Sequence, residues 1–171
     1  MNVFDFAMRL ETDAEAFYRK LAQESPIAGI GKIFTDLAED EKRHFQIFKS
    51  LKEETPQERM TESTVLDTAK SIFARLLQEK DELPALTDDL EGYRYALQIE
   101  AEGARMYRDA ARREKNDAVK ELLLRIAAEE EKHFNIVENI YSFVNAPNQY
   151  LAWAEFSNLE EFRAFGRDVD I

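Results

Sequence analysis

Two E-x-x-H motifs are the parts of this sequence best suited to chemistry. Glu41 and His44 form the first motif, in LAEDEKRHFQIF, and Glu130 and His133 form the second, in IAAEEEKHFNIV. Residues three apart lie on one face of an α-helix, so a carboxylate and an imidazole at this spacing can chelate one metal ion together. Mixed carboxylate and imidazole ligation suits iron or manganese and also allows zinc. The two motifs therefore indicate metal binding.

The motifs belong to an internal repeat whose two copies are offset by 89 residues. The same offset aligns a second pair of segments, LETDAEAFYRKLA and IEAEGARMYRDAA, and in each a glutamate precedes a tyrosine by seven residues. The equivalent pairs in these segments are Glu11 with Glu100 and Tyr18 with Tyr107. Two separate segments that share one offset indicate that the chain consists of two related halves.

Each half is predicted to fold as a helical hairpin. Pro26 and Gly29 mark the turn of the first hairpin, and Asn116 and Asp117 mark the turn of the second. The expected helices cover residues 3–24, 30–53, 88–113 and 118–144. The fold class that follows is all-α, a four-helix bundle made of two repeated hairpins.

A long connection and a C-terminal tail complete the expected organisation. Residues 55–86 contain an amphipathic stretch, which is typical of a helix that crosses from one half of a bundle to the other. Residues 1–144 would thus form one bundle domain that includes this crossover. Residues 145–171 are rich in turn-forming and aromatic residues. We expect this tail to pack on the bundle or on a partner subunit, and the protein to be a homodimer.

Four glutamates and two histidines interrupt the otherwise apolar seams of the predicted helices. They are Glu11, Glu41, His44, Glu100, Glu130 and His133. In each hairpin the two glutamates stand about 15 residues, or roughly 22 Å, from the turn on either side of it. Folding each hairpin therefore sets its two glutamates side by side, and all six groups can meet in one layer of the core.

Such a layer needs metal ions to be stable. Burying a carboxylate costs several kcal/mol, and the mutual repulsion of four carboxylates adds to this cost. Two divalent cations would balance four glutamates and two neutral imidazoles, so we expect two metal ions, with iron favoured and manganese or zinc as alternatives. The simpler alternative is that both histidines only pair with solvated acidic residues on exposed helix faces.

Composition excludes several classes of function. The formal net charge of -12 argues against nucleic-acid binding and against an anionic membrane surface. No apolar run approaches the roughly 20 residues that span a bilayer, and the N-terminus does not look like a secretory signal. The sequence has no cysteine, which rules out thiolate metal sites, thiol catalysis and disulfides. We therefore expect a cytoplasmic protein without membrane or nucleic-acid partners.

With these motifs, the sequence resembles the rubrerythrin branch of the ferritin-like superfamily over about residues 1–144. The resemblance rests on the E-x(6)-Y pattern of the first and third long helices and on the two E-x-x-H pairs. It implies that Glu41 and Glu130 bridge two iron ions and that the other four residues are terminal ligands. It also implies that Tyr18 and Tyr107 hydrogen-bond to ligand carboxylates, although core packing alone would also account for these two tyrosines.

Two differences from typical rubrerythrins affect the expected reaction. The cysteine-containing rubredoxin domain is missing, so electrons would have to come from a separate protein or a small reductant. The additional glutamate that rubrerythrins carry one turn before the third-helix ligand is replaced here, since Ala96 and Leu97 occupy the corresponding positions. Gly103 and Ala104 are small, which either leaves room for O₂ or peroxide or allows close helix packing.

Several functions are compatible with these features. The favoured hypothesis is an oxidoreductase that reduces peroxide or dioxygen in oxidative-stress defence with an external electron donor. The main alternative is ferrous iron binding and oxidation for metal handling, without peroxidase turnover. A bundle stabilised by a redox-silent metal, and a di-iron enzyme acting on an organic substrate, are two further hypotheses.

Overall fold

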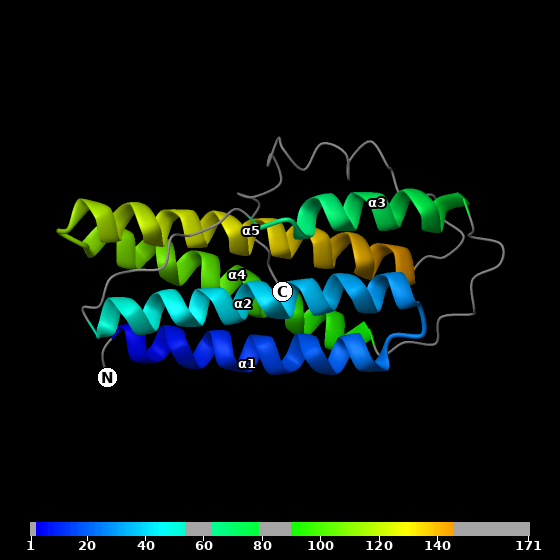
Figure 1. The fold of residues 1–171 in the computed structure, drawn as a ribbon, viewed down its shortest axis with the longest axis horizontal. Coiled ribbons are helices and arrows are strands. Elements are labelled where there is room, and N and C mark those ends of the chain that lie inside the picture. The colour runs from blue at the N-terminus through cyan, green and yellow to red at the C-terminus, as the bar shows by residue number, and fades with distance from the viewer. Residues whose placement is uncertain (1–2, 54–62, 79–89, 146–171) are drawn as a thin grey trace.

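The computed structural model describes residues 3–53, 63–78 and 90–145, and all of the regular structure in these ranges is helical. The helices are α1 (Val3–Glu24), α2 (Ala28–Lys52), α3 (Val65–Gln78), α4 (Leu90–Arg113) and α5 (Asp117–Asn145). The four long helices lie alongside one another, and the shorter α3 lies outside them (Figure 1). The most extensive contacts join α1 to α2 and α4 to α5, which are the two predicted hairpins. The predicted bundle of two hairpins is therefore confirmed.

The first turn is shorter than the sequence predicted. Helix α2 begins at Ala28 rather than at residue 30, so Gly29 lies within the helix and not in the turn. A Cβ atom at Gly29 would lie 2.7 Å from Cγ2 of Ile72 in α3. The absence of a side chain at Gly29 thus permits the close approach of α3 to α2, and tertiary packing overrides the low helix propensity of glycine here.

Gly31 has a similar role where α2 meets α1. A Cβ atom there would lie 2.9 Å from the backbone oxygen of Ala22, which cannot move aside as a flexible side chain could. We expect Gly31→Ala to lower the free energy of unfolding by about 1–3 kcal/mol, as overpacking does. Gly92→Ala is the matched control, because the added Cβ would meet only the ends of two side chains, Leu21 at 3.4 Å and Phe17 at 3.9 Å. Urea unfolding of both variants measures this difference. Equal free energies of unfolding for Gly31→Ala and Gly92→Ala would contradict the prediction.

Two apolar clusters fill the bundle core, and each is packed around aromatic side chains. One contains Tyr18, Phe34 and Tyr93, whose rings stack at centroid distances of 5.9 and 5.7 Å. The other contains Phe48 and Tyr107, whose ring centroids are 4.9 Å apart. The buried residues of α1, α2, α4 and α5 include the six polar groups of the predicted seams. The polar groups are therefore part of the core.

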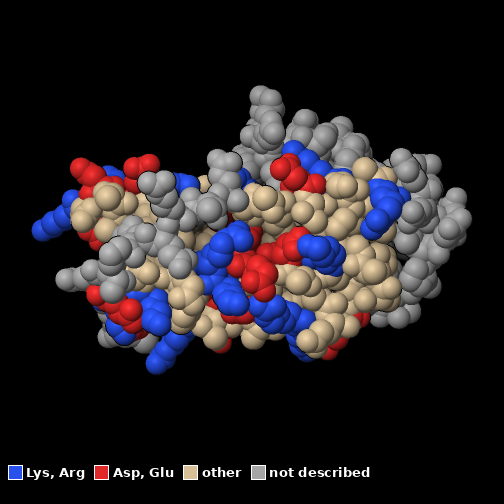
Figure 2. All heavy atoms as spheres, in the orientation of Figure 1, with Lys and Arg blue, Asp and Glu red and all other residues tan. Residues whose placement is uncertain are grey.

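The exposed helix faces carry charged side chains of both signs, which Figure 2 shows interspersed on one face of the molecule. Arg19 of α1 pairs with Glu15 at 2.6 Å and with Glu39 of α2 at 2.8 Å. Pairs of this exposed kind contribute little to stability. None of the described helices is long and apolar enough to cross a membrane.

The crossover and the tail are only partly within the described residues. Helix α3 lies inside the predicted crossover 55–86 and packs on α2 and on α5. Of the predicted tail 145–171, only Asn145 is described, and it is the last residue of α5. The aromatic residues expected to pack on the bundle or on a partner lie outside the described residues.

Candidate metal centre

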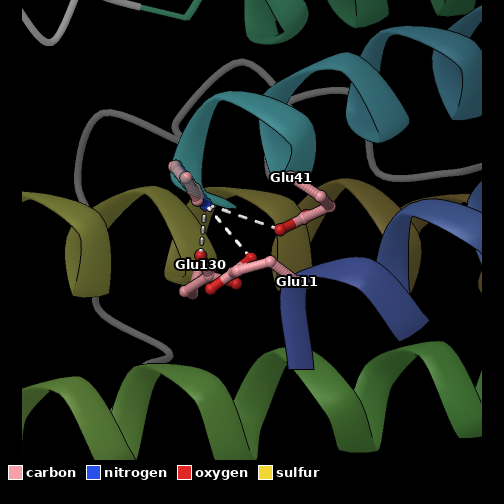
Figure 3. Close-up of side chains that lie close together, drawn as sticks. Glu11, Glu41 and Glu130 are labelled. Carbon is pink, nitrogen blue, oxygen red and sulfur yellow. Dashed lines mark ion pairs between the residues drawn. The ribbon is translucent and has the colours of Figure 1, made fainter. Parts of the chain in front are cut away.

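The four long helices bring the six predicted residues together in one buried layer. None of the six is more than 3% exposed. They form two overlapping groups in which ligand-type atoms all lie within 4.8 Å of one another. The first group is Glu11, Glu41, His44 and Glu130, and the second is Glu41, Glu100, Glu130 and His133. Figure 3 shows the carboxylates of Glu11, Glu41 and Glu130 converging from α1, α2 and α5.

Each histidine turns its Nδ1 atom toward carboxylates of this layer. Nδ1 of His44 lies 2.8 Å from Oε1 of Glu130 and 3.4 Å from Oε2 of Glu41. Nδ1 of His133 lies 2.9 Å from Oε1 of Glu41. The two imidazole rings are nearly parallel, with centroids 5.8 Å apart. Each histidine is therefore closest to a glutamate from the other repeat, and Glu41 and Glu130 lie between the two.

Two tyrosine hydroxyls also connect the repeats, because each donates a hydrogen bond to a glutamate of the other repeat. Tyr18 of α1 donates a hydrogen bond to Oε1 of Glu100 in α4. Tyr107 of α4 donates one to Oε1 of Glu11 in α1. Both phenol rings are buried, at 1% exposure, and burial raises the pKa of both well above the usual value, so the hydroxyls remain donors. Each hydroxyl thereby fixes one oxygen of its glutamate and leaves the other directed into the layer.

Sequence reasoning missed two further carboxylates of the site, Asp40 and Glu129. Nε2 of His44 lies 2.9 Å from Oε2 of Glu129, and Nε2 of His133 lies 3.2 Å from Oδ2 of Asp40. Asp40 and Glu129 each precede a motif glutamate directly and are related by the same 89-residue offset. Their equivalent positions in the two repeats could have indicated a role at the site. Both residues, however, stand in acidic runs that resemble a solvated helix face.

Two further glutamates that lie close to the predicted ligands in sequence, Glu15 and Glu102, point away from this layer. Glu15 pairs with Arg19 on the side of α1, and exposed Glu102 accepts a hydrogen bond from Gln98. Gly103 faces the layer directly, because a Cβ atom there would lie 3.4 Å from Oε2 of Glu130. Its equivalent in the first repeat is Ala14, which is buried. The layer is therefore less crowded beside Glu130 than the repeat alone would suggest.

The metal-free layer keeps protons that solvated groups would lose. Burial raises the pKa of Glu11 to about 8, and burial together with the charges of Glu41 and Glu11 raises that of Glu130. Burial alone would lower the pKa of His44 and His133, but the neighbouring carboxylates reverse this and raise both values well above 6.5. Burial likewise opposes ionisation of Glu41, yet the two histidines hold its pKa below the usual range. Without metal ions, protons on these groups would therefore balance part of the negative charge of the layer.

The hydrogen bonding of the layer fits metal ions better than protons. Seven buried side-chain oxygen and nitrogen atoms in the described residues make no hydrogen bond of suitable geometry, and six of them belong to this layer, although the ring nitrogens approach carboxylates to 2.8 and 2.9 Å. The six are both carboxylate oxygens of Glu41, Oε2 of Glu100, Oε1 of Glu130 and Nδ1 of each histidine. Such atoms are costly to bury unless something else satisfies them. Carboxylate oxygens and imidazole nitrogens converging in this way form a donor set suited to iron, manganese or zinc.

Binding of metal ions should release protons and strengthen as the pH rises. Glu11, Glu130 and both histidines have raised pKa values in the metal-free layer, and each must lose its proton to act as a ligand. We expect affinity to increase between about pH 6 and about pH 8, because Glu11, whose pKa is raised to about 8, must lose its proton to bind metal over this interval. Calorimetric titration in two buffers of different ionisation enthalpy measures the protons released. Affinity independent of pH, with no buffer dependence, would contradict this prediction.

Comparison with known proteins gives one match. The model of a family described as a ferritin-like domain matches residues 1–142, which include both hairpins and all six residues of the layer. No curated protein and no solved structure gives a match. The match agrees with the predicted superfamily, whereas assignment to its rubrerythrin branch stays a prediction.

Proposed function

The chain belongs to the ferritin-like domain family, and from that premise we propose that the buried layer holds two iron ions and carries out redox chemistry. The observation that carries this proposal is the overlap of the two groups of ligand atoms, which share Glu41 and Glu130. Two groups with two common carboxylates are what a pair of bridged metal ions requires, as in the di-metal carboxylate bundles.

We assign the ligands on this basis. Glu41 and Glu130 would bridge the two ions. Glu11 and His44 would complete one position, and Glu100 and His133 the other; the two positions are equivalent under the repeat. Four glutamates and two neutral imidazoles balance the charge of two divalent ions. The ions would therefore remove the repulsion among the four carboxylates, which protons would otherwise have to reduce. Manganese or zinc would satisfy the same ligands.

The proposed reaction is the reduction of peroxide or dioxygen as a defence against oxidants in the cytoplasm. When bound, two ferrous ions would supply the two electrons that, with two protons, convert one hydrogen peroxide to two waters, and an external donor would return the electrons. The chain's own contribution would be positional: Tyr18 and Tyr107 hold two ligand carboxylates, and the aromatic clusters on either side exclude water. Gly103 has no side chain beside Glu130, so this is the side from which we propose that a small oxidant approaches the layer.

Rapid mixing of the anaerobic diferrous protein with hydrogen peroxide tests this reaction. We expect about two irons to be oxidised per peroxide, and repeated turnover when a reductant is added, because each peroxide requires two electrons. Iron that oxidises once and is never re-reduced by any donor, protein or small molecule, would overturn the peroxidase proposal. The metal content of protein from iron-replete cells can be measured by elemental analysis. Finding zinc in place of iron would overturn the redox proposal as a whole.

Iron binding and oxidation for metal handling is the second candidate, and one observation favours it. Ala96, one turn before Glu100, is buried at 1% exposure and supplies no carboxylate. The additional glutamate that rubrerythrins carry at this place therefore has no counterpart in this chain. Single oxidation followed by release of ferric iron to a chelator would support this candidate. Light scattering would measure the oligomeric state, and we propose that the protein is a homodimer. Storage of an iron mineral would instead require a large hollow shell.

A further inference from the structure

The outer face of each histidine is held by a carboxylate from the opposite repeat. Nδ1 of His133 lies in the metal layer, while Nε2 faces Oδ2 of Asp40 at 3.2 Å. Nδ1 of His44 lies in the same layer, while Nε2 faces Oε2 of Glu129 at 2.9 Å. Asp40 and Glu129 are themselves buried, at 3% and 7% exposure. Neither belongs to the groups of metal-ligand atoms, so both act on the histidines and not directly on the layer.

These contacts determine which ring nitrogen can bind a metal ion. A carboxylate only accepts hydrogen bonds, so Nε2 of each ring must carry the proton that it donates. In the neutral ring, Nδ1 then has a free lone pair directed at the layer, as a ligand requires. An outer carboxylate of this kind fixes the tautomer and the orientation of the ring and makes it a better ligand.

The two outer carboxylates are anchored differently. Asp40 also accepts hydrogen bonds from Nη2 of Arg43 and from Oγ of Ser63. The Ser63 hydroxyl in turn accepts a hydrogen bond from the backbone N–H of Val65, the first residue of α3, at 3.2 Å. Within the described residues, His44 is the one hydrogen-bond partner of Glu129. The carboxylate behind His133 is thus tied to the start of α3, and the one behind His44 is not.

Outer carboxylates such as Asp40 and Glu129 are usual behind metal-binding histidines. We propose that here they make the two metal positions unlike, because Ser63 ties Asp40, and through it the His133 position alone, to the connecting helix α3. This inference rests on the proposed di-metal site and adds to it: the repeat makes the ligands of the two positions equivalent, whereas their outer contacts make the positions inequivalent. Asp40 would act on the metal beside His133, and Glu129 on the metal beside His44.

A crossed set of double variants tests this assignment with cobalt(II) as the probe. In a His44→Ala background, which leaves the His133 position intact, we expect Asp40→Asn to weaken binding at that position about 10- to 100-fold. Glu129→Gln in the same background should change it less than about threefold, within ordinary additivity for an independent site. In a His133→Ala background the two effects should exchange. The affinities come from anaerobic titrations monitored by the cobalt absorption bands.

Ser63→Ala tests the anchor separately. It removes one hydrogen bond to Asp40 and leaves every proposed ligand in place. We expect it to weaken cobalt binding severalfold in the His44→Ala background and to leave binding unchanged in the His133→Ala background. Glu39→Gln is the matched control, because this exposed glutamate of α2 pairs with Arg19 and does not contact either histidine. Helix content by circular dichroism, measured without metal, would identify any variant that fails to fold.

The outcomes separate this inference from the proposed function. Wild-type protein that binds no cobalt or iron would remove the proposed function, and the inference with it. Wild-type protein that binds two ions, with Asp40→Asn and Glu129→Gln weakening both positions equally or neither, would overturn the inference alone. Equal effects of Ser63→Ala in the two histidine backgrounds would show that the positions are not distinguished by their anchoring.

Discussion

Replacing Glu41 or Glu130 with alanine will abolish tight binding of both metal ions, whereas replacing Glu11 or Glu100 will weaken only one of them. The difference follows from geometry, since Glu41 and Glu130 are each common to the two groups of ligand atoms and Glu11 and Glu100 each belong to one. Loss of a shared ligand removes a donor from both positions at once and leaves their ions without a common carboxylate. We expect the stoichiometry to fall from two ions to none for the shared residues, and the second ion to be retained for the others.

Equilibrium dialysis against ferrous iron or cobalt(II), under anaerobic conditions, measures this stoichiometry. Glu39→Ala serves as the control, because it removes an exposed carboxylate from the same helix as Glu41. Its stoichiometry should equal that of the wild-type protein. A Glu41→Ala protein that kept one tightly bound ion would show that Glu41 is a terminal ligand and not a bridge.

Changing Glu130 to glutamine will stabilise the metal-free protein and will remove most of the stability gained from metal. Burial and the charges of Glu41, Glu11 and Glu100 raise the pKa of Glu130 well above its usual 4.5, so the folded state resists its ionisation. The unfolded chain loses this proton near pH 4.5, and above that pH Glu130 therefore destabilises the fold. Glutamine is of similar size and carries no charge, so we expect a gain of about 1–4 kcal/mol near neutral pH.

The sign of this effect depends on pH and on metal. Below about pH 4.5 the carboxyl group is protonated in both folded and unfolded protein, so the advantage of Glu130→Gln over the wild-type protein should vanish. Urea unfolding in the presence of a chelator, at about pH 7 and about pH 4, measures this difference. With saturating metal the order should reverse at neutral pH, because only the wild-type protein retains both bridging carboxylates. A metal-free variant less stable than wild type at both pH values would contradict this prediction.

Much of the fold and the six converging residues could be predicted because the repeat constrains them twice. The offset that relates Glu41 to Glu130 also relates Glu11 to Glu100, so the two hairpins had to place equivalent groups at equivalent depths. The seam spacing then distinguished these buried glutamates from the many exposed ones. Glu15 and Glu102 lie outside the seam, and the structure places both away from the layer.

The outer contacts could not be predicted, because they join residues from different repeats. Asp40 lies on the same helix as His44 but accepts its hydrogen bond from His133, and Glu129 lies on the same helix as His133 but contacts His44. Only the packing of α2 against α5 brings these partners together. The sequence predicts a turn at Gly29 for a related reason, since the contact of Gly29 with Ile72 of α3 cannot be inferred from helix propensity.

The ligand set indicates a di-metal site but does not by itself distinguish between the possible reactions. The same four glutamates and two histidines suit reduction of peroxide and oxidation of ferrous iron alike. Two residues next to the ligands bear on the choice between these functions: Ala96, which stands in place of a carboxylate, and Gly103, which lies beside Glu130. The residues around the ligands, rather than the ligands themselves, therefore bear on whether the protein reduces peroxide or oxidises ferrous iron.

Anaerobic titration of the metal-free protein with ferrous iron tests the central claim most directly. We predict saturable binding with a break at two ions per chain, lost in Glu41→Ala and reduced in His133→Ala. A break at two ions would establish the di-iron site and justify the peroxide experiment. Absence of saturable binding in the wild-type protein would contradict the account, because the buried layer would then be stabilised by protons alone.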